Sequence, residues 1–300
     1  MRTARLPAVV LMGALLAAAC GCASGDAAPA AEHPYFAGLA APPPWVIAHR
    51  GGMGLWPENT RYAFERAARA GADVLDLDVR TSADGALVVV HDAELGRTTE
   101  ASGRVDALTL RELQSLDAGY RWSSDGGATH PFRGQGIRIP ALDEVFRSFP
   151  GAHLGLEIKE SDPTAPGRVC QAIRGAQMQE RVLVASFHAA ATQAFRAACP
   201  EVASGAVFSE ALRFRVLSAL GLTPTRPPAE ALLVPLRFAG LPVPTAHLVR
   251  TAHALKLHVE AWLANEPAEM ERLLEAGVDG IMTDYPDRLS ELVRRHGATH

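Results

Sequence analysis

The stretch RAGADVLDLD, residues 69–78, contains the unit that decides the fold: the end of a helix, a glycine, an aspartate and an apolar strand. The same order returns near the C-terminus in EAGVDGIMTD, residues 275–284. Apolar runs of this kind, placed between helices, are typical of parallel strands that are buried on both faces. The repeated unit is therefore a helix followed by a strand, as an α/β barrel requires.

Nine short apolar runs are candidate strands. They are WVIAH (45–49), VLDLDV (74–79), LVVVHD (87–92), HLGLEIK (153–159), VLVASF (182–187), SGAVF (204–208), ALLVPL (231–236), HVEAWL (258–263) and DGIMTD (279–284). A TIM-type barrel has eight strands, so one run is expected outside the wall. ALLVPL is the weakest candidate because of its internal Pro235.

The link between the second and third runs contains Asp84-Gly85, which alone favours a hairpin turn. If both runs belong to the barrel wall, this link must instead carry the chain back to the other end of the barrel, so that the two strands run parallel. Roughly 60 residues then separate His91 from His153, where a barrel needs only a helix and two loops. We therefore expect an insertion at about residues 93–150, after the third strand, that overhangs the site.

Helix signals lie between several of the strands. The segment 59–71 starts at Asn59 or Thr60 and stops at a glycine, and Thr109 and Glu112 have the spacing of a capping box. The sequence thus predicts one α/β domain over residues 45–290, a TIM-type (β/α)8 barrel, followed by a C-terminal tail at 291–300.

The composition fits one large globular domain and gives little sign of a nucleic-acid partner. The chain has 300 residues, 48% of them hydrophobic, and a formal net charge of −4. Beyond the N-terminal region the only cysteines are Cys170 and Cys199, and whether they pair is left open. No thiolate cluster has the spacing of a structural zinc site.

The N-terminus has the pattern of an export signal. Arg2 and Arg5 precede an apolar run that ends in small residues before a cysteine. The pattern resembles a bacterial lipoprotein signal, which implies a signal peptide at 1–19 and lipidation of Cys20. Residues 20–44, rich in Ala and Pro, are then expected to be a tether. The protein would be exported and anchored to the membrane of a bacterial cell envelope; the alternative is an ordinary cleaved signal and a soluble secreted or periplasmic enzyme.

Five strand candidates end in, or just before, polar side chains that do not belong in a dry core. These side chains are His49 and Arg50, Asp76 and Asp78, His91 and Asp92, Glu157 and Lys159, and Thr283 and Asp284. Parallel strands bring their carboxyl ends to one barrel mouth, so the side chains should converge there.

The chemistry of this set points to phosphodiester cleavage. Carboxylates supply hard oxygen ligands suited to Mg²⁺ or Ca²⁺. Arg50 presents a planar fork that fits two phosphate oxygens, and Lys159 adds a point charge. Two histidines can supply a base for the nucleophile and an acid for the leaving alkoxide.

The ordered motifs resemble the glycerophosphodiester phosphodiesterase family. They are HRGG (49–52), PENT (57–60), DLDVRTSADGALVVVHD (76–92), LEIK (156–159), SF (186–187), AWLAN (261–265) and DGIMTDYPDRL (279–289). The likeness extends over nearly everything from Trp45 to Leu289. Each motif alone would be weak, whereas the set in this order is specific.

The resemblance implies a role for each matching residue. His49 and His91 would be the acid–base pair, Arg50 would bind and activate the phosphate, Lys159 would steady it, and Trp262 would line the substrate pocket. Glu58, Asp76, Asp78 and Glu157 would be the ligands of one divalent cation, Ca²⁺, Mg²⁺ or Mn²⁺, or near neighbours of those ligands. In one departure, Asp76 stands where the family usually has glutamate.

The implied reaction is hydrolysis of a glycerophosphodiester to glycerol 3-phosphate and an alcohol. Either water or the substrate's own glycerol hydroxyl could attack the phosphorus. The alternatives are a lysophospholipase D, suggested by the anchor and the aromatic insertion, and an anchored phosphodiester-binding lipoprotein without catalysis. The alcohol, the metal and the oligomeric state are left open.

Overall fold

In the computed structural model, the described residues are 33–297. The expected signal peptide (1–19), the lipidation site Cys20 and the first part of the expected tether lie outside the described residues. None of the helices within 33–297 is both long enough and apolar enough to span a bilayer. The described residues form one compact unit by themselves, and this unit contains the complete barrel.

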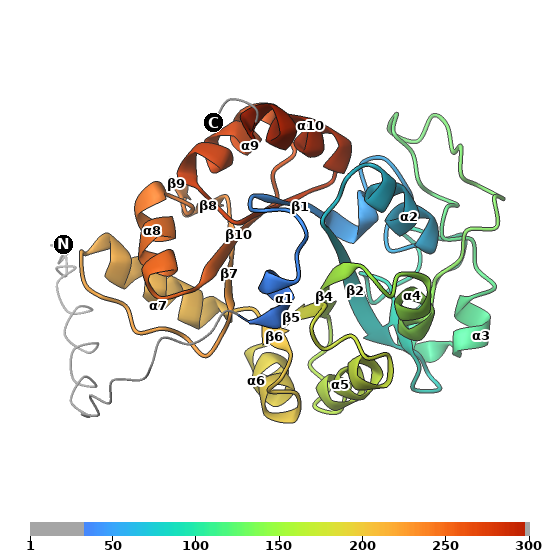
Figure 1. The fold of residues 1–300 in the computed structure, drawn as a ribbon. Helices are drawn as coiled ribbons and strands as arrows, with labels where there is room; N and C mark the ends of the chain where they lie inside the picture. The colour runs from blue at the N-terminus through green and yellow to red at the C-terminus, as the bar shows by residue number, and fades with distance from the viewer. Residues whose placement is uncertain (1–32, 298–300) are drawn as a thin grey trace, which may run out of the picture. The chain divides into compact units, whose positions relative to one another are not determined.

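Within residues 33–297, eight parallel strands form the wall of a barrel (Figure 1). They are β1 (Trp45–Ala48), β2 (Val74–Thr81), β4 (His153–Ile158), β5 (Val182–Ala185), β6 (Ala203–Ser204), β7 (Ala231–Pro235), β10 (His258–Trp262) and β11 (Gly280–Thr283). Their order is β6-β5-β4-β2-β1-β11-β10-β7, and a parallel bridge between Gly205 and Ala231 joins the ends. The predicted (β/α)8 barrel is confirmed.

The expected course of the third strand is wrong. β3 (Leu87–Val89) pairs antiparallel with β2, and the two form a hairpin across Asp84-Gly85, where Gly85 has φ +82°. A left-handed backbone of this kind favours glycine. The run LVVVHD therefore lies outside the wall, and the insertion follows this hairpin strand rather than a third barrel strand.

ALLVPL, expected to be the odd run out, belongs to the wall. Its residues 231–235 form β7, which pairs in parallel with all five residues of β10. Pro235 is the last residue of β7, and the next residue, Leu236, donates its N–H to Trp262 O at 3.0 Å. A proline at the end of a strand leaves the ladder intact, so its cost is small.

Helices cover the outside of the wall. They are α2 (Arg61–Arg69), α4 (Leu142–Ser148), α5 (Ala165–Gly175), α6 (Ala189–Ala198), α7 (Phe208–Ala219), α8 (Ala246–Ala254), α9 (Pro267–Ala276) and α10 (Pro286–Gly297). Thr60, not Asn59, caps α2, because its hydroxyl accepts from Ala63 N–H at 3.1 Å. The expected tail at 291–300 is wrong over 291–297, which continue α10.

The insertion forms a small core of its own beside the hairpin. It contains a 3-10 turn, η2 (Val105–Ala107), and α3 (Leu110–Leu113), which has the predicted Thr109–Glu112 capping box. Its buried side chains are Leu95, Val105, Leu113, Ala118, Ile137 and Ile139, packed with Val88 and Val90. Phe132 packs on this core and contacts Trp122 edge-on at 4.8 Å, so these aromatics serve the insertion's own packing.

The last part of the expected tether closes the base of the barrel. α1 (Pro34–Ala37) buries Tyr35 and Phe36, which are 1% and 3% exposed, among residues at the amino ends of the strands. Phe36 stacks on His258 with ring centroids 3.7 Å apart. The tether prediction is wrong here because it was based on the segment's high content of Ala and Pro, whereas its two large aromatic rings are buried and hold it against the barrel.

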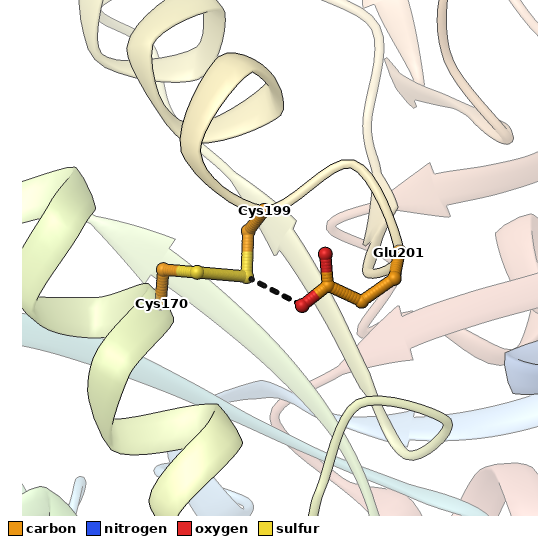
Figure 2. A group of neighbouring side chains, drawn as sticks. All are labelled: Cys170, Cys199 and Glu201. Atoms are coloured by element: carbon orange, nitrogen blue, oxygen red, sulfur yellow. Dashed lines mark hydrogen bonds between the residues drawn. A yellow bond between two sulfur atoms is a disulfide. The ribbon is translucent and has the colours of Figure 1, made fainter.

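A disulfide joins Cys170 in α5 to Cys199 after α6, with the Cα atoms 5.7 Å apart (Figure 2). Glu201 lies beside it, and Arg174 holds that carboxylate at 2.6 Å. In the described part of the chain, Cys170, Cys199 and Glu201 are the one group of three potential metal ligands whose ligand atoms all lie within 4.8 Å of one another. Sulfurs in a disulfide are not thiolates, so we do not interpret the group as a metal site.

Candidate active site

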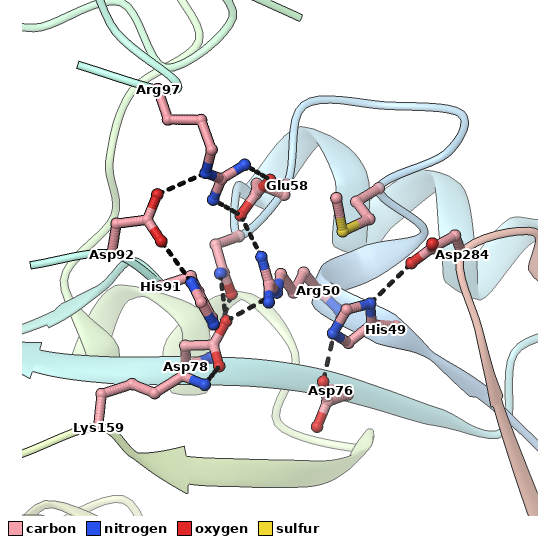
Figure 3. Close-up of polar contacts among 12 residues, drawn as sticks. His49, Arg50, Glu58, Asp76, Asp78, His91, Asp92, Arg97, Lys159 and Asp284 are labelled. Carbon is pink, nitrogen blue, oxygen red and sulfur yellow. Dashed lines mark hydrogen bonds and ion pairs between the residues drawn. The ribbon is translucent and has the colours of Figure 1, made fainter. Parts of the chain in front are cut away.

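The predicted polar side chains meet at the carboxyl end of the barrel (Figure 3). They border a cavity of about 630 Å³. Of the predicted site residues, those that line it are His49, Arg50, Asp76, His91, Glu157, Lys159 and Trp262. Glu58 and Asp78 stand behind this lining, in contact with Arg50.

The loop after β1 places His49 and Arg50 by an unusual backbone course. Arg50 has φ +50°, and Gly51 and Gly52 have φ +81° and +87°. A Cβ on Gly51 would lie 2.8 Å from that of Ala63 in α2, closer than real carbon atoms approach. The glycines of HRGG are therefore required for the chain to turn tightly against α2 and aim both side chains into the mouth.

His49 is oriented by Asp284, which follows β11. Its Nδ1 lies 2.7 Å from Asp284 Oδ1, and Figure 3 shows the ring between Asp284 and Asp76. Asn265 fixes the carboxylate in turn: its Nδ2 donates to Asp284 Oδ2 at 2.7 Å, and its Oδ1 accepts from Asp284 N–H at 2.9 Å. With Nδ1 engaged, Nε2 of His49 is the nitrogen left for chemistry.

His91 has a similar arrangement at the end of the hairpin. Its Nδ1 lies 2.6 Å from Asp92 Oδ1, and Arg97 of the insertion donates to the other oxygen of Asp92. Burial lowers the pKa of His91, and the hydrogen bond to Asp92 only partly offsets this effect. The neutral ring with a free Nε2 is therefore the favoured form near neutral pH.

Glu58 is held between two arginines. It accepts from Arg50 Nη1 at 2.9 Å and from Arg97 Nη1 and Nη2 at 2.6 and 2.7 Å. Burial would raise the pKa of Glu58, but the hydrogen bonds from Arg97 and the charge of Arg50 outweigh it, so the pKa is lowered. Both carboxylate oxygens are thus engaged, and Glu58 fixes the Arg50 guanidinium in place.

Asp78 and Glu157 share one ammonium group. Lys159 Nζ lies 3.1 Å from Asp78 Oδ1 and 2.8 Å from Glu157 Oε2. Asp78 also accepts from Asn59 Nδ2 at 2.8 Å and lies 3.2 Å from Arg50 Nε. Burial raises the pKa of Asp78, yet these cations overcome that effect, so its pKa is lowered and the carboxylate stays ionised.

Asp76 carries buried negative charge that is poorly compensated. Burial raises its pKa to about 7, with further increases from the charges of Asp78 and Glu157, while His49 opposes the shift. The pKa of Glu157 is likewise raised, chiefly by burial. Glu260, deeper in the barrel, has a pKa of about 8 because of its burial and the charges of Asp279 and Asp76.

This surplus of buried carboxylates fits a divalent cation, because Mg²⁺ and Ca²⁺ prefer hard oxygen ligands and the raised pKa values of Asp76 and Glu157 mark carboxylates whose charge is not fully compensated. The predicted ligands are nevertheless not drawn together: across residues 33–297, no three of Glu58, Asp76, Asp78 and Glu157 have ligand atoms all within 4.8 Å. The Lys159 ammonium lies between two of them, and two arginines engage Glu58.

The cavity has a charged half and an apolar half. The apolar half is lined by Phe187, Trp262 and Leu263, and also by Phe208, Leu212 and Phe238. Phe187 contacts Trp262 edge-on, with centroids 5.7 Å apart, and Lys159 Nζ lies 5.9 Å from the Phe187 ring centroid. Trp262 thus lines the cavity, and Phe187 lies between Trp262 and Lys159, at the boundary between the two halves.

Four residues that organise this site received no role from sequence reasoning. Asp284 was grouped with the polar side chains expected at the barrel mouth, but no function was assigned to it. Asn265 and Glu260 lie on or after β10, where the motif points only to Trp262. Arg97 lies in the insertion, where no motif points to it.

Comparisons with known proteins agree with this arrangement. A family model described as the glycerophosphoryl diester phosphodiesterase family matches residues 49–288. The chain is 35% identical over 265 residues to a glycerophosphodiester phosphodiesterase of Caldanaerobacter subterraneus subsp. tengcongensis, covering 84% of this chain and 98% of that one. It is 28% identical over 286 residues to a lysophospholipase D of Rattus norvegicus, covering 84% and 87%.

The fold is also similar to solved structures. One is an Oleispira antarctica phosphodiesterase in complex with the product sn-glycerol-3-phosphate, with a TM-score of 0.66 and 27% sequence identity. The match covers 87% of this chain and 99% of that one. The barrel is therefore shared along the whole matched length.

Proposed function

The chain belongs to the glycerophosphoryl diester phosphodiesterase family and is a phosphoric diester hydrolase, and on this premise we propose that His49 and His91 are its acid–base pair. The observation that carries the proposal is that each ring is held at Nδ1 by a carboxylate, Asp284 or Asp92, beside a pocket that also contains Arg50 and Lys159. The substrate is a glycerophosphodiester, and the products are glycerol 3-phosphate and an alcohol.

The two histidines divide the proton transfers. One Nε2 takes the proton of the attacking hydroxyl, whether from water or from the substrate's glycerol, as the new P–O bond forms. If the glycerol hydroxyl attacks, the first product is a cyclic phosphate, and water must open it in a second step to give glycerol 3-phosphate. The other Nε2 gives a proton to the leaving oxygen as the old P–O bond breaks. Each such transfer is worth about 10²–10⁴-fold in rate.

Arg50 and Lys159 bind the phosphate in this proposal. Glu58 and Asp78 hold the Arg50 guanidinium from behind, at 2.9 and 3.2 Å, so the fork is positioned before the substrate arrives. Charge-assisted hydrogen bonds from a fixed fork stabilise a phosphoryl group as negative charge develops on its oxygens.

Asp76, Asp78 and Glu157 would hold a divalent cation, Ca²⁺, Mg²⁺ or Mn²⁺. The buried and mutually repelling carboxylates Asp76 and Glu157 support the assignment. Such a cation neutralises charge on a phosphoryl oxygen and acidifies a nearby hydroxyl. Glu58, which both arginines engage, is better suited to fixing Arg50 than to direct ligation.

The test is turnover of glycerophosphocholine by His49→Ala and His91→Ala. We expect each variant to lose release of glycerol 3-phosphate while it keeps the wild-type circular dichroism spectrum and melting temperature. Normal turnover by either folded variant would refute the acid–base assignment.

A second candidate activity is that of a lysophospholipase D. The apolar half of the cavity favours it, since Phe187, Trp262 and Leu263 present an apolar surface that suits an acyl chain. Comparison of kcat/KM for glycerophosphocholine and lysophosphatidylcholine separates the two activities, and inertness toward the lysolipid would eliminate the second.

The anchor also stands as a proposal. Lipidation of Cys20 would hold the enzyme at a bacterial cell-envelope membrane, whereas an ordinary cleaved signal would release it. Metabolic labelling with a fatty-acid analogue should fail on Cys20→Ala, and labelling that survives this change would exclude Cys20 as the acceptor.

A further inference from the structure

The outer face of α7 carries an apolar stripe that the protein's own fold leaves uncovered. Phe208, Leu212, Val216 and Leu220 recur every fourth residue and so lie on one side of the helix. Their exposed fractions are 58%, 37%, 47% and 68%, while Phe214 on the opposite side is buried at 2%. A helix at the surface of a soluble protein normally turns polar residues outward, so this stripe marks a contact face.

A neighbouring hairpin extends the stripe. β8 (Arg237–Phe238) and β9 (Leu241–Pro242) pair antiparallel, and Phe238 and Leu241 are 48% and 64% exposed. The rings of Phe208 and Phe238 lie 5.7 Å apart, which joins the two elements into one surface. We call this the rim surface; it comprises Phe208, Leu212, Val216, Leu220, Phe238 and Leu241.

The rim surface continues into the active-site cavity. Phe208, Leu212 and Phe238 line the cavity as well as the exterior. Every exposed large hydrophobic side chain found within residues 33–297 belongs to the sequence segment from Phe187 to Leu241. The apolar surface therefore reaches the pocket at Phe208, Leu212 and Phe238 and extends from there along α7.

The charge beside the rim surface is positive, unlike that of the whole chain. Four arginines, 213, 215, 226 and 237, lie in the segment 208–243, and within residues 33–297 none of them forms an ion pair. The two acids of the segment are already engaged: Glu210 pairs with Arg196 at 2.9 Å, and Glu230 accepts from Ser204 N–H at 2.8 Å. The chain as a whole has a net charge of −4.

We propose that the rim surface docks on the surface of an anionic phospholipid bilayer. Apolar side chains flanked by arginines suit the boundary between acyl chains and negatively charged headgroups. Continuity with the cavity then lets a lipid-borne phosphodiester enter the pocket without crossing water. Docking is a binding property and does not depend on turnover, so it can be tested separately from the reaction.

The test is cosedimentation of the fragment 32–300 with vesicles of phosphatidylcholine that contain phosphatidylglycerol, and with vesicles of phosphatidylcholine alone. This fragment holds the complete barrel, its base and its disulfide, and it lacks the N-terminal segment that would bind membranes by itself. The double variant Val216→Gln/Leu220→Gln changes the stripe at two positions outside the cavity lining. Leu241→Gln alters the hairpin independently.

The matched control is Ala176→Gln/Ala197→Gln, which adds two glutamines at exposed positions, one at the end of α5 and one in α6. We expect wild type and control to bind the anionic vesicles equally, and the stripe variant to bind about 10-fold more weakly, since it loses two apolar side chains at the interface. Leu241→Gln should weaken binding to a smaller degree. Hydrolysis of soluble glycerophosphocholine should be unchanged in every variant.

Three results would overturn the proposal: no binding of the wild-type fragment to anionic vesicles, equal binding by the stripe variant, or equal binding to both kinds of vesicle. Analytical ultracentrifugation tests whether a second copy of the chain covers the rim surface instead. The proposal would also be overturned if the wild type is a dimer that binds no vesicles and the stripe variant is a monomer. If vesicle binding follows the expectation but glycerophosphocholine is not hydrolysed, the reaction proposal fails and docking stands.

Discussion

Replacing Asp284 by asparagine should disable His49 without moving it. The two side chains have the same shape, but the surroundings dictate which way an amide must lie. Asn265 Nδ2 donates to Asp284 Oδ2 at 2.7 Å, so the amide oxygen of the variant will take that position and its NH₂ will face His49. The NH₂ then donates to Nδ1, which moves the ring proton to Nε2. As a base, His49 then lacks the lone pair that accepts a proton; as an acid, it lacks the carboxylate that stabilises the charged ring.

The expected cost follows from the loss of one member of the acid–base pair, about 10²–10⁴-fold in kcat, or about 3–5 kcal/mol in activation free energy. The assay is initial-rate release of glycerol 3-phosphate from glycerophosphocholine, with thermal unfolding as the check on folding. The double variant Asp284→Asn/Asn265→Asp is the control: the carboxylate introduced at position 265 accepts from the new amide, turns the amide oxygen back toward His49 and should recover part of the rate. A single variant with near wild-type kcat, or a folded double variant with no recovery, would refute the reasoning.

Other predictions concern stability. Phe36→Ala should cost about 3–5 kcal/mol because the ring is 3% exposed and stacked on His258; over the 265 described residues this lowers Tm by about 5–9 °C in thermal unfolding, and an unchanged Tm would mean that α1 does not close the base. Burial, assisted by the charge of Arg181, lowers the pKa of His153 to about 4 from its usual 6.5, so folding favours the neutral ring. The neutral His153 ring contributes fully to the free energy of unfolding above pH 6.5, and at most about 3 kcal/mol of this contribution is lost as the pH falls toward 4. His153→Leu should therefore flatten the dependence of the urea-unfolding free energy on pH between 6.5 and 4. The same pH dependence in the wild type and the variant would contradict this. Because the disulfide closes a loop of 29 residues, Cys170→Ser/Cys199→Ser should lower the free energy of unfolding by up to about 3.5 kcal/mol, and equal urea midpoints would argue against a formed bond.

The barrel could be predicted from the sequence because its strands are buried on both faces and so appear as continuous apolar runs between helices. β3 has the same apolar character, although it is a short antiparallel partner of β2. Only the Asp84-Gly85 turn distinguishes it, and this local turn signal was correct, whereas the choice of ALLVPL as the run outside the wall was not. Pro235 led to the opposite error, the exclusion of ALLVPL from the wall, because its position at the very end of β7 is visible only in the structure.

The convergence of the site residues could be predicted as well, because parallel strands deliver their carboxyl ends to one mouth. The contacts among those residues could not. Asp284 is held by Asn265, 19 residues away in the sequence, and Arg97 of the insertion reaches Glu58 across 39 residues. Such pairings depend on side-chain geometry across different loops, which no spacing rule encodes.

The most direct test of the account is release of glycerol 3-phosphate from glycerophosphocholine by the fragment 32–300 after chelation, and then with Mg²⁺, Ca²⁺ or Mn²⁺ restored one at a time. The account predicts that chelation abolishes release, that at least one of these cations restores it in the wild type, and that none restores it in His49→Ala. Full release after chelation would contradict the cation site, and no release with any cation from folded protein would contradict the proposed reaction.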